Sequence, residues 1–192
     1  MKKIVVALVA VVVVILVLVI SFHSEANTFV ELNENVALQA AQVESALQRR
    51  SDLIPNLVET VKGYTKHEEA VFTEIANARA KLKESIGTNN LEAVEEASAA
   101  LEISIDRLTT MVAEDYPELN ASQQFIGLQD ELAGTENRIN TARQDYNEAV
   151  REYNTAVRRF PGSIIANAMG YDPLSYFEAE ESAKEAPVVS FE

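Results

Sequence analysis

The side chains with the greatest potential for catalysis or metal binding are the two histidines, His23 and His67. A di-metal helical bundle needs a glutamate three residues before a histidine on the same helix face, and neither histidine has one. Serine–histidine chemistry would have to use His67, and no glycine-flanked nucleophile elbow accompanies it. The chain has no cysteine, which excludes thiolate nucleophiles, disulfides and cysteine-based zinc sites. We therefore expect no enzymatic activity, no catalytic residue, no bound metal and no cofactor. The segment His67-Glu68-Glu69 is interpreted as a solvated helix surface.

A second group of polar side chains lies at Arg49-Arg50-Ser51-Asp52. Two guanidinium groups beside a helix start can clamp a carboxylate of a neighbouring chain or of the C-terminal tail. In the simpler interpretation, Asp52 caps a helix and the arginines offset the local acidity. Arg49, Arg50 and Asp52 are therefore candidate interaction residues, and the simpler interpretation is favoured.

The C-terminal residues form the second candidate interaction segment. An acidic stretch from Glu178 to Glu185 is followed by Pro187, Val188, Val189 and Phe191, of which the last three favour extended structure. Such a segment can pair with a strand or fill a groove, and its acidic tether would be attracted to basic side chains such as Arg49 and Arg50. We expect the tail to pack on its own bundle or on a neighbour's and to help lock an assembly. The alternative is a frayed terminus.

Residues Ile4 to Ile20 form an unbroken run of isoleucine, valine, alanine and leucine. As a helix this run is about 25 Å long, and Ser21 and Phe22 bring it close to the thickness of a bilayer core. The run predicts a single transmembrane helix. Lys2, Lys3 and the Ser24-Glu25-Ala26 pattern also fit a cleavable signal peptide, but the run is longer than the usual core of one.

The distribution of charge suggests both an orientation and a class of partner. Lys2 and Lys3 precede the apolar run, and the positive-inside rule then places the bundle on the non-cytoplasmic side. All 30 acidic residues and 14 of the 16 basic residues follow the run, so this part carries a net charge of −16. Such a negative field repels nucleic acid and anionic lipid, and it argues against either as a partner.

Beyond Asn27 the apolar residues recur every three or four positions, which is typical of helices. Ser51 or Asp52 can cap a second helix, because Pro55 would then lie near its first turn, where its missing N–H costs little. The alternative is one long helix kinked at Pro55. The first stripe contains Phe29, Leu32, Val36, Val43 and Leu47, and the second contains Leu57, Val61, Tyr64, Val71, Ile75, Ala78 and Leu82.

Glycine and proline mark the ends of the later helices. The second helix, which would include His67, ends at Gly87-Thr88-Asn89-Asn90, and the third ends near Asp115-Tyr116-Pro117. The fourth ends before Pro161, and residues 164–169 form a short helical segment. The third stripe contains Leu91, Val94, Leu101, Ile105, Leu108 and Val112; the fourth contains Phe125, Leu128, Leu132, Ile139, Ala142, Tyr146, Ala149, Tyr153, Ala156 and Phe160.

Long helices with one apolar stripe each, joined by short turns, predict an all-α fold, an elongated antiparallel bundle of about four long helices. The stripes are narrow and close to a heptad, which favours coiled-coil-like packing. We expect three regions: a cytoplasmic stub and transmembrane anchor at 1–22, a helical bundle at 23–160, and a short helix with an extended acidic tail at 161–192.

Two stretches resemble the bacterial LemA family. Residues 49–64, RRSDLIPNLVETVKGY, resemble its signature, and residues 177–181 with 186–191, FEAEE and APVVSF, look like its C-terminal ending. Ala41-Gln42-Val43 stands where the family is expected to have a tryptophan-containing segment, and this chain has no tryptophan. The resemblance implies a helical fold and a membrane location, and it does not imply a biochemical activity.

The resulting functional hypothesis is a single-pass bacterial inner-membrane protein that self-associates as a homo-oligomeric structural or assembly protein. Confinement to a membrane plane raises the effective concentration of the copies, so weak contacts suffice. The alternative is an extramembrane sensor or binding module for a ligand or protein partner that the sequence does not identify, and a hydrolase is the third and weakest hypothesis.

Overall fold

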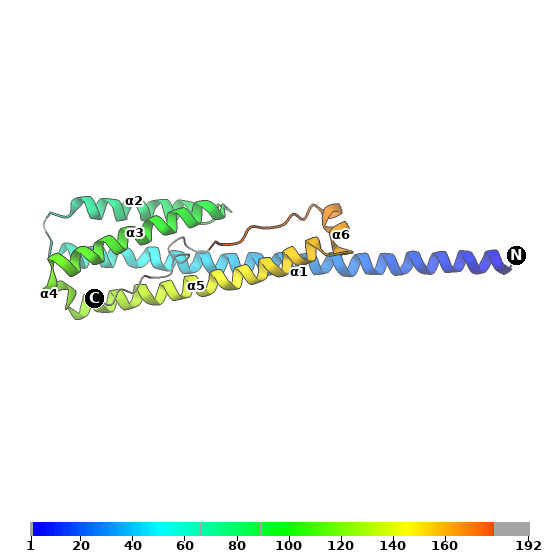
Figure 1. Cartoon of the computed structure of the whole chain (residues 1–192), viewed down its shortest axis with the longest axis horizontal. Helices are drawn as coiled ribbons and strands as arrows, with labels where there is room; N and C mark the ends of the chain where they lie inside the picture. Colours follow the sequence, from blue (N-terminus) through cyan, green and yellow to red (C-terminus); the bar gives the residue numbers. More distant parts are fainter. Residues whose placement is uncertain (1, 66, 89, 179–192) are drawn as a thin grey trace, which may run out of the picture. The chain divides into compact units, whose positions relative to one another are not determined.

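In a computed structural model of the chain, residues 2–65, 67–88 and 90–178 are described, and within residues 2–21 only Leu8, Val12, Val13, Ile15, Leu16 and Ile20 have described side chains. All regular secondary structure in these residues is helical, as the all-α prediction requires (Figure 1). The helices are α1 (Lys2–Lys62), α2 (Glu69–Ser85), α3 (Leu91–Asp115), α4 (Pro117–Asn120), α5 (Gln123–Arg158) and α6 (Gly162–Met169).

The described chain divides into two compact units. The first unit contains residues 2–39 and 145–175, and the second contains residues 40–144 and 176–178. Helices α1 and α5 each contribute residues to both.

Helix α1 continues through Pro55, so the predicted helix start at Ser51 or Asp52 is wrong and the alternative of one long helix is confirmed. A proline inside a helix lacks the N–H that would bond to the carbonyl four residues earlier, which here belongs to Ser51. The interruption is tolerated because that carbonyl oxygen accepts a hydrogen bond from another helix, as described below.

The second predicted helix is interrupted where none was expected. Helix α1 ends at Lys62 and α2 begins at Glu69. Tyr64, which the predicted stripe placed in the core, is 55% exposed, and His67 is an exposed residue of the connection rather than of a helix. Tyr64 is therefore not a core residue and His67 is not a helical one. Both were misplaced because the spacing of apolar residues continues across the connection between α1 and α2, where the chain turns back.

The predicted ends of the later helices are confirmed. Gly87 adopts φ +82°, a conformation that favours glycine, and the Asn90 side chain accepts a hydrogen bond from the Ala93 N–H at 3.2 Å to cap α3. Helix α3 ends at Asp115, directly before Tyr116-Pro117. The short helix α4 was not predicted, and Phe160, expected in the fourth stripe, lies beyond the end of α5 and is 76% exposed.

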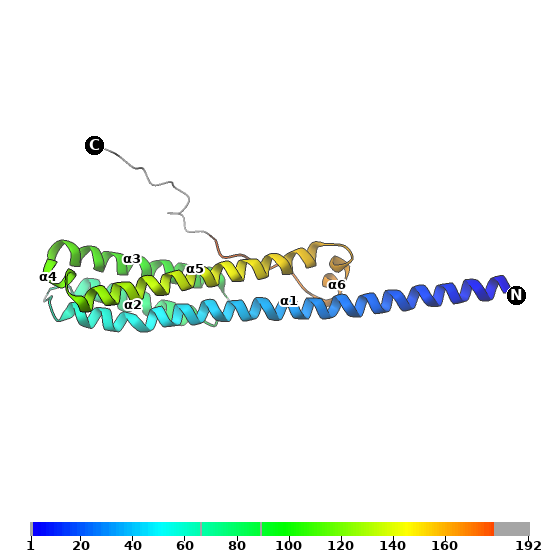
Figure 2. The same cartoon turned by 90° about the horizontal axis from the view of Figure 1, so that it is seen from below.

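In the second unit, residues of α1, α2, α3 and α5 form an antiparallel bundle (Figures 1 and 2). The contacts between neighbouring helices show that they are antiparallel, because the residue number falls along one helix as it rises along its partner. The pairs are Thr60–Gln124 and Arg50–Glu136 for α1 with α5, Lys62–Phe72 and Asp52–Lys83 for α1 with α2, and Glu68–Tyr116 and Glu74–Arg107 for α2 with α3. The buried core contains the residues of the predicted stripes, among them Leu47, Leu57, Ile75, Leu82, Leu101, Leu108, Phe125 and Ile139.

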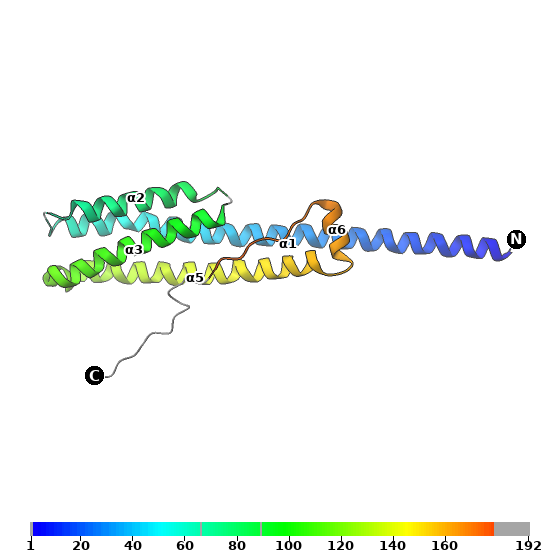
Figure 3. The ribbon, with the colours of Figure 1, turned by 45° about the horizontal axis from the view of Figure 1, so that its top comes forward.

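In the first unit, α6 packs beside α1 (Figure 3). The rings of Phe29 and Tyr171 stack with centroids 5.5 Å apart, and Tyr153 meets Tyr171 edge-on at 6.3 Å. Gly162, at the start of α6, allows close approach, since a Cβ there would lie 2.6 Å from the carbonyl oxygen of Ala156 and 3.3 Å from the Phe29 ring. This position therefore requires a glycine.

Within the described part of the chain, no helix is both long and apolar enough to cross a membrane. Most residues of the predicted anchor Ile4–Ile20 have side chains that lie outside the described ones.

Candidate functional site

Arg50 is the centre of a buried polar cluster in the second unit. Its side chain extends from α1, and the residue is 6% exposed. One terminal nitrogen, Nη1, donates a hydrogen bond to Oε2 of Glu136 on α5, and it lies 3.9 Å from Oε2 of Glu102 on α3. The Arg50 Nε has no hydrogen-bond partner. One guanidinium thus links α1 to α5 by a charge-assisted hydrogen bond, which is stronger than a neutral one, and to α3 by a longer ion pair.

Next along α1, the Ser51 carbonyl accepts a hydrogen bond of 2.7 Å from Nε of Arg79 on α2. This is the carbonyl whose helical partner Pro55 removes, so an arginine of α2 supplies the donor that the proline lacks. The Ser51 hydroxyl oxygen is buried and has no hydrogen-bond partner. The signature proline is therefore accommodated by a tertiary contact.

Asp52 lies on the exposed side of α1. Its carboxylate accepts two hydrogen bonds of 2.9 Å from Gln48 Nε2 and lies 3.5 Å from Lys83 Nζ and 3.8 Å from Arg79 Nη2. The hydrogen bonds from Gln48, followed by the charges of Lys83 and Arg79, hold the pKa of Asp52 below its ordinary value. Asp52 thus lies in the interior of α1, where it forms ion pairs with α2, and it does not cap a helix start.

Arg49 is the more exposed of the two arginines, and its Nη2 lies 3.9 Å from Oε1 of Glu131. The carboxylates found beside both arginines come from helices of the same chain. The other predicted interaction residues, Pro187, Val188, Val189 and Phe191, lie outside the described residues.

The last described residues of the extended C-terminal segment pack on the second unit. The Phe177 ring is buried, and the guanidinium carbon of Arg143 on α5 lies 5.7 Å from its centroid. The Glu178 N–H donates a hydrogen bond of 2.9 Å to Oε1 of Glu95 on α3. The segment thus contacts two helices just before the predicted docking residues.

In the first unit, Asn154 holds the extended segment after α6. Its amide nitrogen donates to the Leu174 carbonyl oxygen and its amide oxygen accepts from the Leu174 N–H, both at 2.8 Å. The Tyr146 hydroxyl donates to the Ser175 carbonyl oxygen at 3.3 Å. Asn154 was not among the predicted residues, although a polar residue between Val150 and Val157 on an apolar helix face is a recognisable signal.

Two tyrosines have perturbed acidity. Burial, and then the nearby Tyr171 and Asp172, raise the pKa of Tyr153. Burial and a hydrogen bond from its hydroxyl to Glu68 raise the pKa of Tyr116. Both changes favour the neutral hydroxyl, and that of Tyr116 donates to Oε1 of Glu68 at 3.1 Å.

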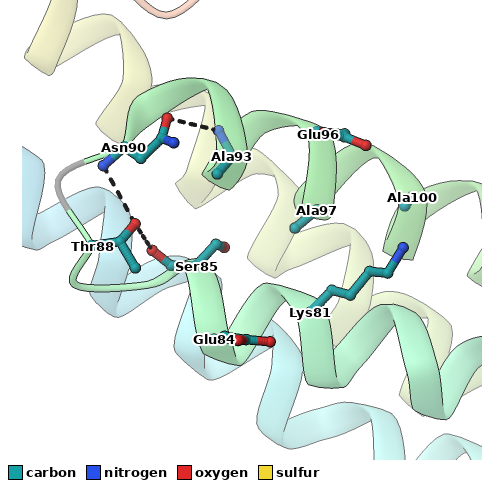
Figure 4. A pocket seen from close by; sticks show the side chains of 9 residues that line it. All are labelled: Lys81, Glu84, Ser85, Thr88, Asn90, Ala93, Glu96, Ala97 and Ala100. Atoms are coloured by element: carbon teal, nitrogen blue, oxygen red, sulfur yellow. Dashed lines mark hydrogen bonds between the residues drawn. The ribbon is translucent and has the colours of Figure 1, made fainter.

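A cavity of about 390 Å³ lies beside the turn between α2 and α3 (Figure 4). Thr88 donates to the Ser85 carbonyl oxygen at 2.7 Å, and the Asn90 N–H donates to the Thr88 hydroxyl oxygen at 3.3 Å. These polar groups stabilise the turn itself, while Ala93, Glu96, Ala97 and Ala100 form the α3 wall.

A second cavity, of about 440 Å³, lies in the first unit where α5 ends. Glu25 of α1 lines it together with Glu152 and Arg159, and the walls also include Phe160, Pro161 and Gly162. The cavity thus places Arg159, Phe160, Pro161 and Gly162, at the junction of α5 and α6, at the level of Glu25 on α1.

Neither histidine takes part in these clusters, and both are exposed. Among the described residues, no group of three or more histidine, aspartate or glutamate side chains is placed to hold a metal ion.

A sequence model of the LemA family matches residues 39–191. Magnetosome proteins MamQ 1 and MamQ 2 of Paramagnetospirillum magneticum are each 25% identical over 187 residues, covering 85% of this chain and 68% of the relative. Magnetosome protein MamQ of Magnetospirillum gryphiswaldense is 22% identical over 190 residues, with the same coverage. The family match includes the Arg49–Tyr64 stretch and the segment after α6.

Proposed function

The chain belongs to the LemA family, and from this premise we propose that it is a non-enzymatic, membrane-anchored structural protein that self-associates. The anchor would be residues 4–20 of α1, with the bundle on the non-cytoplasmic side of a bacterial inner membrane. The name of the MamQ relatives refers to magnetosomes, and attachment to a cellular assembly fits this role.

The observation that carries the proposal is the exposure of apolar side chains along residues 8–20. The six described side chains of this run are 47–63% exposed. A contiguous apolar surface of this kind normally contacts lipid or another protein. If residues 4–20 form a membrane anchor, lipid covers this apolar surface.

The polar clusters support a structural role. Arg50, Arg79 and Asn154 each use their polar groups to join segments of the same chain. Such contacts stabilise a bundle, and they do not resemble a nucleophile held beside a base.

Membrane fractionation with an alkaline wash tests the anchor. The full chain should remain in the membrane pellet, whereas a variant carrying Val13→Arg and Leu16→Arg should be released, because charges at the centre of an apolar helix are costly in a bilayer. Leu38→Arg is the control, an exposed apolar residue of α1 outside the run, and it should remain in the pellet. Release of the unmodified chain would contradict the proposal. A reporter fused after Glu192 tests the side of the membrane.

The mass of the detergent-extracted chain, measured by light scattering with electron microscopy, tests self-association. A homo-oligomer of defined size is expected. A monomer would contradict self-association and favour a binding module, for which the cavity between α2 and α3 would be the first place to probe.

A further inference from the structure

The corner between α5 and α6 exposes apolar side chains next to two basic ones. Phe160 is 76% exposed, and Ile164 and Met169 are 62% and 42% exposed. Arg158 and Arg159 directly precede Phe160 and are also exposed. The opposite side of α6 is buried through Ile165 and Ala166, so α6 has one face packed on the protein and another that presents apolar groups outward. We call residues 158–169 the α5–α6 corner.

The corner has a defined position along α1, because both ends of α6 contact Phe29. Gly162 approaches the Phe29 ring at the start of α6, and Tyr171 stacks on the same ring after its end. In Figure 3, α6 accordingly lies directly beside α1. The cavity at this corner brings Arg159 and Phe160 to the level of Glu25.

Glu25 is only three residues beyond Phe22, where the apolar segment ends. Three helical residues correspond to about 4.5 Å along the axis. The headgroup layer on each side of a bilayer core is about 5–8 Å thick. If residues 4–22 span the core, Arg159 and Phe160 lie at the height of the lipid headgroups.

We propose that the α5–α6 corner docks on the bilayer surface, with Phe160 and Ile164 inserted at the headgroup boundary and Arg158 and Arg159 on lipid phosphates. The inference rests on the proposed anchor and adds a second, separate membrane contact. Aromatic and basic residues are the side chains that favour this layer.

The charges around the corner bear on whether it prefers anionic or neutral lipids. Glu25 and Glu152 line the same cavity as Arg159, so the corner is not uniformly basic. The net charge of −16 beyond the apolar run repels anionic lipid as a whole, but Arg158 and Arg159 place two positive charges side by side at the corner that would meet the headgroups. Docking should therefore be stronger on anionic bilayers, to which basic residues near a membrane are attracted.

Single tryptophans report the depth of each part, because the natural chain contains no tryptophan. The variants are Phe160→Trp for the corner, Leu16→Trp for the anchor and Ile103→Trp as an exposed apolar control on α3. Each full chain is reconstituted into phosphatidylglycerol–phosphatidylcholine vesicles with spin labels placed near the headgroup or at the end of the acyl chain. Circular dichroism checks that each variant retains its helix content.

The Phe160→Trp variant should show blue-shifted emission that the shallow label quenches more than the deep label. The Leu16→Trp variant should be quenched more by the deep label, and Ile103→Trp by neither. Adding Arg158→Gln and Arg159→Gln to Phe160→Trp should reduce quenching in anionic vesicles and leave it unchanged in pure phosphatidylcholine.

The outcomes separate the two proposals. Quenching of Leu16→Trp with none of Phe160→Trp would overturn the docking and retain the anchor. Quenching of Phe160→Trp with none of Leu16→Trp would retain the docking and overturn the anchor. Equal quenching of Phe160→Trp and Ile103→Trp would overturn the docking, because the corner would then behave like any exposed surface.

Discussion

The Nε of Arg79 donates a hydrogen bond of 2.7 Å to the carbonyl oxygen of Ser51, the one helical carbonyl of α1 that Pro55 deprives of its partner. The two residues are 28 positions apart, on different helices. An unpaired backbone carbonyl in a packed bundle is costly, and the arginine of α2 supplies the hydrogen bond that the proline of α1 removes. This contact explains how a proline-containing signature continues as one helix.

Arg79→Ala should destabilise the chain by about 1–3 kcal/mol, because it leaves the Ser51 carbonyl without a donor. The effect should be smaller in a Pro55→Ala background, where the alanine N–H restores the helical hydrogen bond. The measurement is a double-mutant cycle from urea unfolding of the full chain in detergent, followed by circular dichroism.

Arg107→Ala is the matched control for this cycle. Arg107 pairs with Glu74 at 2.8 Å between two helices, but both side chains are more exposed than that of Arg79. Its removal should cost less than about 1 kcal/mol, as for other surface ion pairs, and should not depend on Pro55. Equal costs of Arg79→Ala in both backgrounds would show that the proline and the arginine are independent.

The two adjacent arginines of the signature should differ sharply in their contribution to stability. Arg50→Ala should cost about 3 kcal/mol, because Glu102 and Glu136 would lose the charge they share inside the bundle. Arg49→Ala should cost less than about 1 kcal/mol, since Arg49 and Glu131 are exposed. Thermal unfolding of both variants makes the comparison.

A second variant separates the ion pair from the packing of the Arg50 side chain. If charge pairing is the cause, combining Arg50→Met with Glu102→Gln and Glu136→Gln should recover much of the stability lost in Arg50→Met alone. A triple variant as unstable as Arg50→Met alone would instead assign the loss to packing.

Asp52 should contribute to the acid sensitivity of the chain. Its pKa is lowered in the folded state, so the folded chain binds this proton less tightly than the unfolded chain does. The stabilisation is therefore present above the ordinary aspartate pKa of about 3.9 and is lost as the pH falls through the lower folded value. Asp52→Asn should lower the melting temperature slightly near neutral pH and match the natural chain in strong acid. Because the carboxylate is largely exposed, the effect should stay below about 1 kcal/mol.

Melting temperatures measured from neutral to acid pH test this prediction, with Asp106→Asn as a control on an exposed face of α3. A constant difference between Asp52→Asn and the natural chain at all pH values would show that the loss does not come from ionisation.

Local chemistry made much of the fold predictable. The helix ends at Gly87, Tyr116-Pro117 and Pro161 follow from glycine and proline at the boundaries, and the stripes identified most of the core. The sequence leaves open the two alternatives at Pro55, a new helix or one continuous helix, because no local pattern links Pro55 to Arg79, which donates to the Ser51 carbonyl oxygen. The turn after Lys62 was missed because the spacing of apolar residues continued past it into α2.

The candidate site was only partly predictable for the same reason. The Arg49–Asp52 segment was identified from its charges, but the partners of Arg50 follow it by 52 and 86 residues and lie on two other helices. Choosing Glu102 and Glu136 among 30 acidic residues requires the helix pairing, which the sequence leaves open.

Asn154 should control the extended segment after α6. Asn154→Ala removes both hydrogen bonds to Leu174, whereas Asn154→Asp keeps the acceptor, removes the donor and places a charge at a buried position. Both variants should increase hydrogen exchange of the Leu174 amide, with a larger increase for alanine at that amide, because aspartate can still accept from it. Thr155→Ala, which alters an exposed neighbour whose hydroxyl donates to the Arg151 carbonyl oxygen within α5, is the control. Unchanged exchange at Leu174 in Asn154→Ala would show that the Tyr146–Ser175 bond and the Phe29–Tyr171 stack are sufficient to hold the segment.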